Sequence, residues 1–443
     1  MRVPRGLGFA GTLFFIESKA AVPESSMSST HTETHWPWRE GDTARVPYRV
    51  FTDPELYRRE QERIFQGPTW SYVGLECEVP EEGSFRTTHI GDVPIILSRA
   101  KDGQVHVLIN RCSHRGALVL HEACGVRKRF NCVYHQWGFD PDGTLRAVPF
   151  QKGVQGRGGY CPGDLDMKAL SLRRLKVEVL NGLVFASFRE DTPPLREYLG
   201  GVWPQLTGVF DGRKLEVLGY LRQRVKANWK LYFENVKDPY HAGLLHLFVA
   251  TFGLFRATQR GETLAEPSGC GHLVSYKGGA EEHREEYEQQ GISSYQKGYQ
   301  LRAPELMRKL PDFEDDIAVS IQTVFPSLVI HRISNSLATR QVVPRGVEEF
   351  DLIWTLLGYA DDPPELRNQR ILQANLVGPS GYVSLEDVEA LEIVQRGIQG
   401  ERGDAAFVAL GGKQVLYGEP VPDLANETAI RGFWKTWRTL MEP

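Results

Sequence analysis

Two short runs of cysteine and histidine are the residues of this 443-residue chain best suited to bind a redox metal centre. Cys112 and His114 are two positions apart, and Cys132 and His135 are three positions apart. Two thiolates and two imidazoles suit a [2Fe–2S] cluster in which one iron keeps two cysteines and the other takes two histidines. Because neutral imidazoles replace anionic thiolates, the reduction potential rises. The pattern therefore predicts an electron relay.

A structural zinc site is the main alternative, because zinc also accepts two cysteines and two histidines. Zinc fingers usually present paired cysteines and paired histidines, whereas each run here carries one of each. An iron–sulfur cluster needs this interleaving, since each iron draws its own kind of ligand from both runs. We therefore favour the Rieske pattern over zinc. Of the other cysteines, Cys124 has no ligand spacing, and we expect Cys77, Cys161 and Cys270 to be buried apolar residues.

A second group of metal-binding side chains lies downstream, around His241 and His246. On a regular α-helix, two side chains five residues apart diverge by about 140°. We therefore expect an irregular backbone that lets both rings face one ion. Pro239 disfavours helical geometry at Asp238, which makes Asp238 a natural N-cap, and Gly243 permits local unwinding or a π-bulge. Asp238 can also accept the second ring N–H of His241.

Two histidines and one carboxylate on one face of Fe(II) leave the opposite coordination positions open to oxygen and substrate. The carboxylate must come from another part of the chain, and the run 381–389 supplies candidates. We favour Asp387, with Glu386 and Glu389 as alternatives. An acid in this run could equally stabilise a helix N-terminus by facing the helix macrodipole.

The elements that must position the first group form a short-stranded region. Residues 52–55 resemble a capping box with proline in the first turn, which predicts a helix to about residue 66. From residue 70 to 188 the chain is rich in short β-type runs separated by turn residues, and residues 140–143 mark a hairpin turn. The expected strands are 70–75, 93–98, 105–110, 175–179 and 183–188. This region is therefore predicted to be a small all-β domain.

A polar, proline-bearing break at residues 191–194 predicts a domain border. Beyond it, strands expected at 216–225, 319–330 and 350–359 mix with helices expected at 365–375, 385–399 and 428–440. This order indicates an α+β domain rather than regular βαβ alternation. We expect a disordered leader at 1–45, an N-terminal helix at 46–68 packing on the catalytic domain, a Rieske domain at 69–189 and a catalytic domain at 190–443. Residues 276–300 are the expected mobile insertion.

Composition describes an ordinary globular protein, with 24% charged residues and a net charge of −4. Nucleic acid is not an expected partner, and no run reaches the roughly 18 apolar residues that a membrane span requires. Six scattered cysteines favour a reducing compartment, so a cytoplasmic location is expected. The first 26 residues loosely resemble a secretory signal, but we interpret them as an upstream reading of the start site, with Met27 as a plausible beginning.

From about residue 45 the chain resembles the large (α) subunit of Rieske-type aromatic-ring-hydroxylating oxygenases. The runs 110–116, 132–137 and 234–241 look most like the anthranilate 1,2-dioxygenase and salicylate hydroxylase group of that family. Ala117 stands where respiratory Rieske proteins carry a further cysteine, so their cluster-shielding disulfide is absent here. The resemblance implies the following roles: cluster ligands Cys112, His114, Cys132 and His135; Fe(II) ligands His241, His246 and Asp387; and Asp238 as the carboxylate that bridges the two centres.

The resemblance further implies a small all-β Rieske domain followed by a larger α+β catalytic domain of antiparallel sheet plus helices. It also implies one [2Fe–2S] cluster and one mononuclear Fe(II) as cofactors. The substrates would be a small aromatic acid and O2, and electrons would come from NAD(P)H through a ferredoxin reductase and a ferredoxin. An α3 or α3β3 oligomer with small β subunits is expected. The best substrate hypothesis is anthranilate 1,2-dioxygenation to catechol, with salicylate 5-hydroxylation to gentisate or 1-hydroxylation to catechol as alternatives.

A Rieske electron-transfer protein without oxygenase activity is the alternative from another class. The second group of ligands and about 250 further residues argue against a simple carrier. A carboxylated substrate would need a cation near the iron. Arg332 and Arg340 are candidates, although the sequence favours reading both as surface arginines.

Overall fold

The computed structural model describes residue 38 and residues 42–206, 208–256, 258–267, 271–277, 284–400 and 403–442. Most of the expected leader therefore lies outside the described residues. Its end is packed, however: Trp38 is 5% exposed, and its ring lies 5.3 Å from that of Trp434. Strand β1 (Arg45–Pro47) pairs with β19 (Ala405–Phe407). Packed residues therefore occur before residue 46 as well.

The Rieske region is built from small antiparallel sheets, and this confirms the predicted all-β character. One sheet, in the order β5-β4-β3-β6, contains β3 (Ser84–Ile90), β4 (Val93–Arg99), β5 (Val105–Ile109) and β6 (Cys124–Val126). Two three-stranded sheets contain β7 (Phe130–Asn131), β8 (Gly138–Phe139) and β9 (Leu145–Ala147), and β10 (Lys176–Leu180), β11 (Leu183–Ser187) and β2 (Ser71–Leu75). The predicted hairpin turn joins β8 to β9, and its Gly143 has the positive φ of 86° that favours glycine.

The catalytic region is organised around a seven-stranded antiparallel sheet. In spatial order its strands are β12 (Leu215–Val225), β18 (Glu349–Tyr359), β17 (Ser336–Gly346), β16 (Leu328–Ile333), β15 (Ile317–Val324), β14 (Gly271–Lys277) and β13 (Gly261–Ala265). The single strand predicted at 319–330 is in fact two strands, β15 and β16. Pro326 lies between them, and a residue without a backbone N–H interrupts a ladder of hydrogen bonds.

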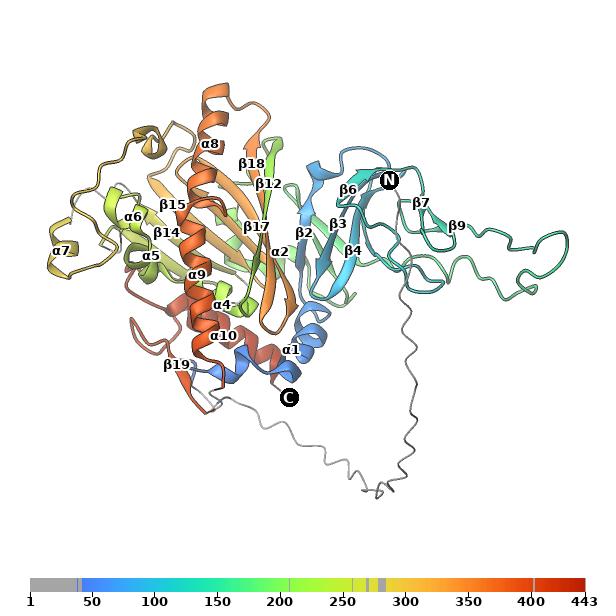
Figure 1. Cartoon of the computed structure of the whole chain (residues 1–443), viewed down its shortest axis with the longest axis horizontal. Coiled ribbons are helices and arrows are strands. Elements are labelled where there is room, and N and C mark those ends of the chain that lie inside the picture. The colour runs from blue at the N-terminus through green and yellow to red at the C-terminus, as the bar shows by residue number, and fades with distance from the viewer. Residues whose placement is uncertain are drawn as a thin grey trace, which may run out of the picture. The chain divides into compact units, whose positions relative to one another are not determined.

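Helices cover this sheet, so the α+β fold class is confirmed; α8 and α9 lie across one face (Figure 1). The α-helices are α1 (Pro54–Glu60), α2 (Leu195–Leu199), α3 (Trp203–Leu206), α4 (Trp229–Asn235), α5 (Pro239–Leu245), α6 (Leu247–Phe252), α7 (Arg284–Gln289), α8 (Pro364–Val377), α9 (Tyr382–Gly397) and α10 (Thr428–Met441). The 3-10 helices are η1 (Tyr48–Phe51), η3 (Glu76–Glu78), η4 (Gly200–Val202) and η5 (Pro304–Met307), and the π-helix η2 (Gln61–Phe65) continues α1. None of the described helices combines the length and apolarity needed to cross a membrane.

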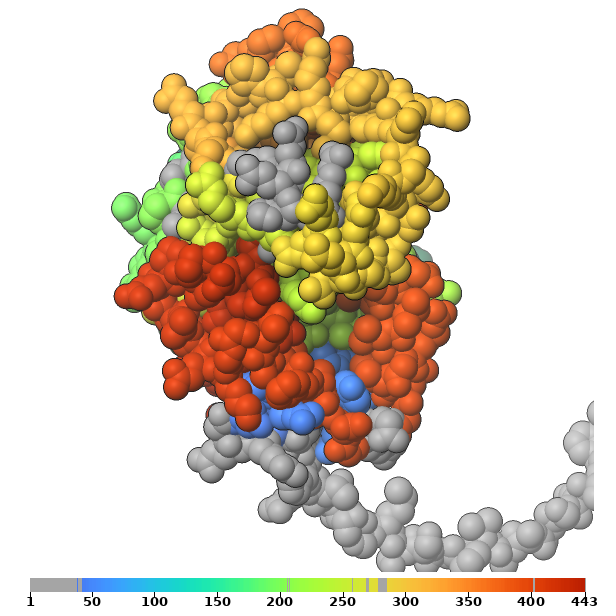
Figure 2. Space-filling model, turned by 90° about the vertical axis from the view of Figure 1, so that its left-hand side faces the viewer, coloured from blue at the N-terminus to red at the C-terminus, as the bar shows by residue number. Residues whose placement is uncertain are grey.

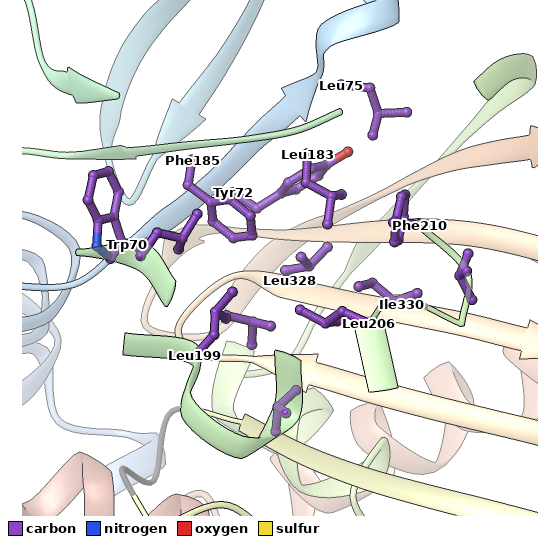
Figure 3. Close-up of a cluster of buried hydrophobic side chains, with 14 of the residues drawn as sticks. Trp70, Tyr72, Leu75, Leu183, Phe185, Leu199, Leu206, Phe210, Leu328 and Ile330 are labelled. Carbon is purple, nitrogen blue, oxygen red and sulfur yellow. The ribbon is translucent and has the colours of Figure 1, made fainter. Parts of the chain in front are cut away.

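Strands β2 and β11 pack against the large sheet through a common hydrophobic cluster (Figure 3). Trp70, Tyr72 and Phe185 on one side meet Leu328 and Ile330 of β16 on the other. Polar contacts cross the same boundary, because the backbone N–H of Tyr72 donates to the hydroxyl of Ser327 at 3.1 Å. The Rieske region and the catalytic region of one chain therefore share a continuous hydrophobic core.

The first helix is anchored to the catalytic region by a buried acid. Glu60 accepts hydrogen bonds from the indole N–H groups of Trp229 and Trp437, and it pairs with the ammonium group of Lys230 at 2.6 Å. The helix begins as expected near residue 54, but its N-cap is Asp53, whose carboxylate accepts the N–H of Glu55 at 2.8 Å. No reciprocal capping box forms around Thr52.

The predicted insertion at 276–300 lies partly outside the described residues. Its described part contains the end of β14 and the short helix α7. Figure 2 shows the yellow residues that follow residue 284 on the same face as the orange-red helix α9 and the dark-red C-terminal segment. Figure 1 shows α5 and α6, the two helices on either side of His246, between α7 and α9.

Candidate metal centres

Two loops of matching shape carry the four predicted cluster ligands. The first follows β5, and the N–H of Cys112 donates to the carbonyl of Ala117 at 2.8 Å. The second connects β7 to β8, and the N–H of Cys132 donates to the carbonyl of Trp137 at 2.9 Å. In each loop the residue four positions after the cysteine has a positive φ, 77° at Gly116 and 56° at Gln136. A glycine suits this position better than glutamine, which accepts some backbone strain there.

The loops bring the four side chains together at one end of the Rieske region. Both cysteines are buried, and the pKa of the Cys112 thiol is raised by burial and by the adjacent Cys132 thiol. The rings of His114 and His135 lie with centroids 4.6 Å apart, and both are partly exposed. His114 also stacks on the buried ring of Trp137 at 4.7 Å. Paired thiols beside paired imidazoles fit the mixed ligand set of a Rieske cluster.

The remaining cysteines are less buried than the sequence suggested. Cys161 and Cys124 are exposed, and Cys77 is only partly buried. Cys161 lies in an exposed loop, so its expected place in a core is wrong. Cys270 lies outside the described residues.

The second group of ligands depends on a break between two short helices. Asp238 caps α5, since its carboxylate accepts the N–H of Tyr240 at 2.8 Å, as predicted. The irregularity falls at His246 rather than at Gly243, which lies inside α5. His246 has extended backbone angles of φ −81° and ψ 109° and separates α5 from α6. This break turns the His246 ring back toward His241, and the ring centroids are 5.5 Å apart.

The structure brings His241, His246 and Asp387 together. The Oδ1 atom of Asp387 lies 3.3 Å from Nε2 of each histidine, and one ligand atom from each residue falls within 4.8 Å of the other two. Asp387 is in the second turn of α9, so it does not serve the helix N-terminus. Two imidazoles and a carboxylate on one side of a shared point are the donor set of a facial Fe(II) site.

The charge balance of this group also favours a cation. Burial lowers the pKa of His241, but Asp238 and Asp387 more than offset burial and raise it to about 10. Burial opposes ionisation of Asp387 as well, yet the two histidines hold its pKa far below the usual range. The pKa of His246 is raised by Asp387 and Glu386 against the effect of burial. The carboxylates around these two histidines therefore suit a bound metal cation.

Glu386 and Asn235 are not among the three candidate ligands, but they contact the side chains that are. One oxygen of Glu386 lies 2.9 Å from Nδ1 of His246, and the other accepts the backbone N–H of Leu247 at 3.2 Å. Asn235 donates to Oδ1 of Asp387 at 3.0 Å. Glu386 thus acts on a histidine, while Glu389, the other alternative, is exposed and lies 3.7 Å from Arg396. Asn235 was not predicted as a site residue, although it lies in the same run as Asp238.

Asp238 contacts His241, and both side chains are partly exposed. Its Oδ2 atom is 3.3 Å from Nδ1 of His241, an ion-pair contact without the alignment of a hydrogen bond. Its other oxygen caps α5, so the carboxylate is held in place by the helix it begins. The predicted contact between these two side chains is therefore present, in a looser form than expected.

An apolar cavity opens beside the three candidate iron ligands. Its walls include side chains from α5, α9 and four strands of the large sheet. The apolar lining residues are Val236, Ala242, Phe255, Val274, Tyr276, Val319, Ile321, Ile333 and Val383. Arg340 of β17 is the one lysine or arginine among the described residues that line it. Both Arg340 and Arg332 are buried, so the prediction that these arginines lie on the protein surface is wrong. An apolar chamber with few polar groups is typical of a site for a small organic ligand.

The geometry is that of a Rieske-linked, mononuclear-iron oxidoreductase, and comparisons with known proteins agree. The chain matches the Rieske [2Fe-2S] domain over residues 69–157 and the ring hydroxylating alpha subunit (catalytic domain) over residues 212–443. The chain belongs to the ring-hydroxylating oxygenase α subunits. It carries the Rieske [2Fe–2S] domain and the mononuclear-iron catalytic domain of that family, and it is the terminal oxygenase component.

Three relatives are similar over nearly their whole length. The chain is 43% identical to the anthranilate 1,2-dioxygenase large subunit of Burkholderia cepacia, covering 92% of this chain and 96% of the relative. It is 42% identical to the terephthalate 1,2-dioxygenase α 2 subunit of a Comamonas species, covering 91% and 97%. It is 39% identical to the salicylate 5-hydroxylase large oxygenase component of a Ralstonia species, covering 91% and 96%.

The fold also matches a solved structure. Naphthalene 1,2-dioxygenase from a Rhodococcus species, bound to indole, superposes with a TM-score of 0.71 at 24% identity and covers 90% of this chain and 95% of that one. At this identity the match concerns the fold alone.

Proposed function

We propose that this subunit hydroxylates a carboxylated aromatic ring, using O2 and electrons derived from NAD(P)H. The observation that carries the substrate class is Arg340, a buried cation in the cavity beside the iron ligands. Anthranilate 1,2-dioxygenation to catechol is the first candidate reaction. Salicylate hydroxylation at position 5 or position 1 is the alternative, and the terephthalate relative adds a second carboxylated substrate to the test.

The environment of Arg340 explains why it calls for an anion. Its side chain donates to Nδ1 of His331 at 3.1 and 2.7 Å and to the hydroxyl of Tyr232 at 2.9 Å, and it lies 4.1 Å from the Trp354 ring. All these partners are neutral. Among the described residues no carboxylate lies within 4.0 Å of it. A buried charge without a counter-ion is costly, so a substrate carboxylate would complete the site.

Arg332 is equally buried, but its charge has a counter-ion within the protein. Its guanidinium forms two ion-pair contacts with Asp315, one of them at 2.8 Å, so its charge is already neutralised within the protein. It also does not line the cavity in the described part of the chain. The structure therefore favours Arg340 of the two candidates.

We propose that Cys112, His114, Cys132 and His135 hold the cluster and that His241, His246 and Asp387 hold Fe(II). When bound, the iron supplies oxygen activation and the cluster supplies electrons. The residues of the chain then have separate tasks. The apolar walls exclude water and receive the ring, Arg340 orients the carboxylate, and Asn235 and Glu386 hold the iron ligands. Domain ranges of 69–189 and 190–443 remain our proposal for the two regions.

We also propose an α3 or α3β3 assembly in which the cluster of one subunit serves the iron of the next through Asp238. Exposed apolar side chains near the cluster loops and near the iron ligands supply two surfaces for such a contact. They are Leu118, Val133 and Tyr134 in the first group, and Tyr240, Tyr382 and Leu385 in the second. Mixed oligomers of a Cys132→Ser subunit and an Asp387→Ala subunit should regain activity that neither has alone. Their failure to do so would contradict electron delivery between subunits.

The substrate proposal is tested by a panel of benzoates in the enzyme reconstituted with its reductase and ferredoxin. Arg340→Gln should lower kcat/KM for the best carboxylated substrate by roughly 10- to 100-fold, since a hydrogen bond to a charged group contributes about 1.5–3 kcal/mol. Binding of the neutral carboxamide analogue should change less than about threefold, because an uncharged amide forms no ion pair with the guanidinium. Oxygen uptake and product chromatography provide the measurements.

Arg345→Gln is the matched control. Arg345 also lies on β17, but it pairs with Asp351 at 2.7 Å and does not line the cavity. It should leave the preference for carboxylate over carboxamide unchanged. An Arg340 variant that weakens both ligands equally would remove the support for a carboxylated substrate.

A further inference from the structure

His331 is a fully buried histidine that contacts the cavity arginine from the neighbouring strand. It lies on β16, and Arg340 lies on β17 opposite Val329, two residues away on the same face of the sheet. The Nδ1 atom of His331 receives both Nε–H and Nη2–H of Arg340, at 3.1 and 2.7 Å. This single nitrogen therefore holds one edge of the guanidinium.

The arginine determines which tautomer His331 adopts. A guanidinium has only N–H donors and stays protonated, so Nδ1 of His331 must be the unprotonated acceptor. The ring proton is then on Nε2, which donates to the hydroxyl of Ser336 at 3.1 Å. Ser336 is itself fully buried, so the ring is held from both sides. Burial, and then the charge of Arg340, lower the pKa of His331 far below its usual value and keep the ring neutral.

Three of the five N–H groups of Arg340 are satisfied in this way. Nε and one hydrogen of Nη2 face His331, and one hydrogen of Nη1 faces Tyr232. One N–H on each terminal nitrogen has no partner among the described residues. Two such groups are what a carboxylate needs for a two-point contact.

The arrangement also separates Arg340 from the iron ligand. Asp387 lines the same cavity, and a free guanidinium in a buried site would be attracted to that carboxylate. Such a pair would neutralise the charge meant for the substrate and occupy an oxygen meant for iron. Neutral acceptors hold the cation in place without cancelling its charge.

We propose that His331, oriented by Ser336, is a positioning residue that holds Arg340 ready for the substrate carboxylate and away from Asp387. This inference rests on the proposed role of Arg340 and adds a specificity-determining residue that does not touch the substrate itself.

Two replacements of His331 separate positioning from simple packing. His331→Phe keeps a ring against Trp354 but removes the acceptor, whereas His331→Asn keeps an acceptor oxygen near the position of Nδ1. The measurements are KM for the best carboxylated substrate, the inhibition constant of its carboxamide, and the mononuclear iron content. The holoenzyme is used, and its Rieske spectrum reports on folding.

His331→Phe should raise KM for the carboxylate at least tenfold, change the inhibition constant of the carboxamide less than threefold, and lower the iron content. His331→Asn should restore KM to within about threefold of the parent. Should His331→Phe fail to fold, Tyr232→Phe removes the other acceptor and should raise the same KM while sparing the carboxamide.

Equal weakening of both ligands by His331→Phe, or an unchanged KM, would overturn the inference. The Arg340→Gln result distinguishes failure of the positioning role of His331 from failure of the substrate proposal. If Arg340→Gln loses the preference for carboxylate and His331→Phe does not, the positioning role is wrong and the substrate proposal stands. If Arg340→Gln keeps the preference, the substrate proposal itself fails.

Discussion

Glu386 connects a candidate iron ligand to the backbone of the next helix, and its replacement tests how the iron site is held. Its carboxylate receives Nδ1–H of His246 at 2.9 Å and the N–H of Leu247 at 3.2 Å. The first contact keeps the proton on Nδ1 and leaves the Nε2 lone pair facing Asp387. Only that tautomer can bind iron through Nε2.

Glutamine at position 386 cannot satisfy both donors. If its oxygen accepts from Leu247, its amide N–H₂ faces His246 and favours the wrong tautomer; if its oxygen accepts from His246, the amide opposes the N–H of Leu247. Losing one hydrogen bond to a charged acceptor costs about 1.5–3 kcal/mol. Glu386→Gln should therefore weaken Fe(II) binding roughly 10- to 100-fold, in the range found when the partner of a metal-bound histidine is removed.

Equilibrium dialysis against buffered Fe(II), followed by metal analysis, measures this affinity, and the visible Rieske spectrum confirms that the other centre is intact. Glu389→Gln is the control on the same helix, since Glu389 is exposed and lies 3.7 Å from Arg396. The control should bind iron like the parent. Parental iron affinity in Glu386→Gln would refute the idea that this carboxylate orients His246.

Three further outcomes are expected. Asp387→Ala should lose the mononuclear iron and keep the Rieske spectrum, and full iron occupancy would transfer the ligand role to another acid. Asp238→Asn should still cap α5 and bind both centres but reduce turnover roughly 10- to 100-fold by weakening its contact with His241; parental turnover would retire that role. Burial raises the pKa of Glu234 to about 8, above its unfolded value of 4.5, so stability should fall as pH rises between these values. Glu234→Gln lacks this titration, so by pH 8 its stability relative to the parent should have risen by on the order of 4 kcal/mol. If the melting temperatures of the two proteins change in parallel from pH 5 to 8, this prediction is wrong.

Local sequence signals predicted the parts of both metal centres that lie close together in the chain. The two cluster loops, the Asp238 cap and the irregular spacing of His241 and His246 each depend on a few neighbouring residues. The position of the irregularity was missed, because Gly243 and His246 can both interrupt a helix and only packing selects between them. Strand β17 was also missed: its polar residues are buried on both faces, so it lacks the alternation that marks a half-exposed strand.

The amino-acid sequence alone determined the cofactor chemistry, because metal-ligand types and short spacings are encoded within a few residues of each other. Tertiary structure alone decided which arginine serves the cavity. Arg332 and Arg340 are eight residues apart on adjacent strands, and they differ only in what the folded sheet places around them. Asp315 neutralises one, while His331 and Tyr232 hold the other without cancelling its charge. Charge balance in a buried site is a property of the surrounding residues, and these come from distant parts of the chain.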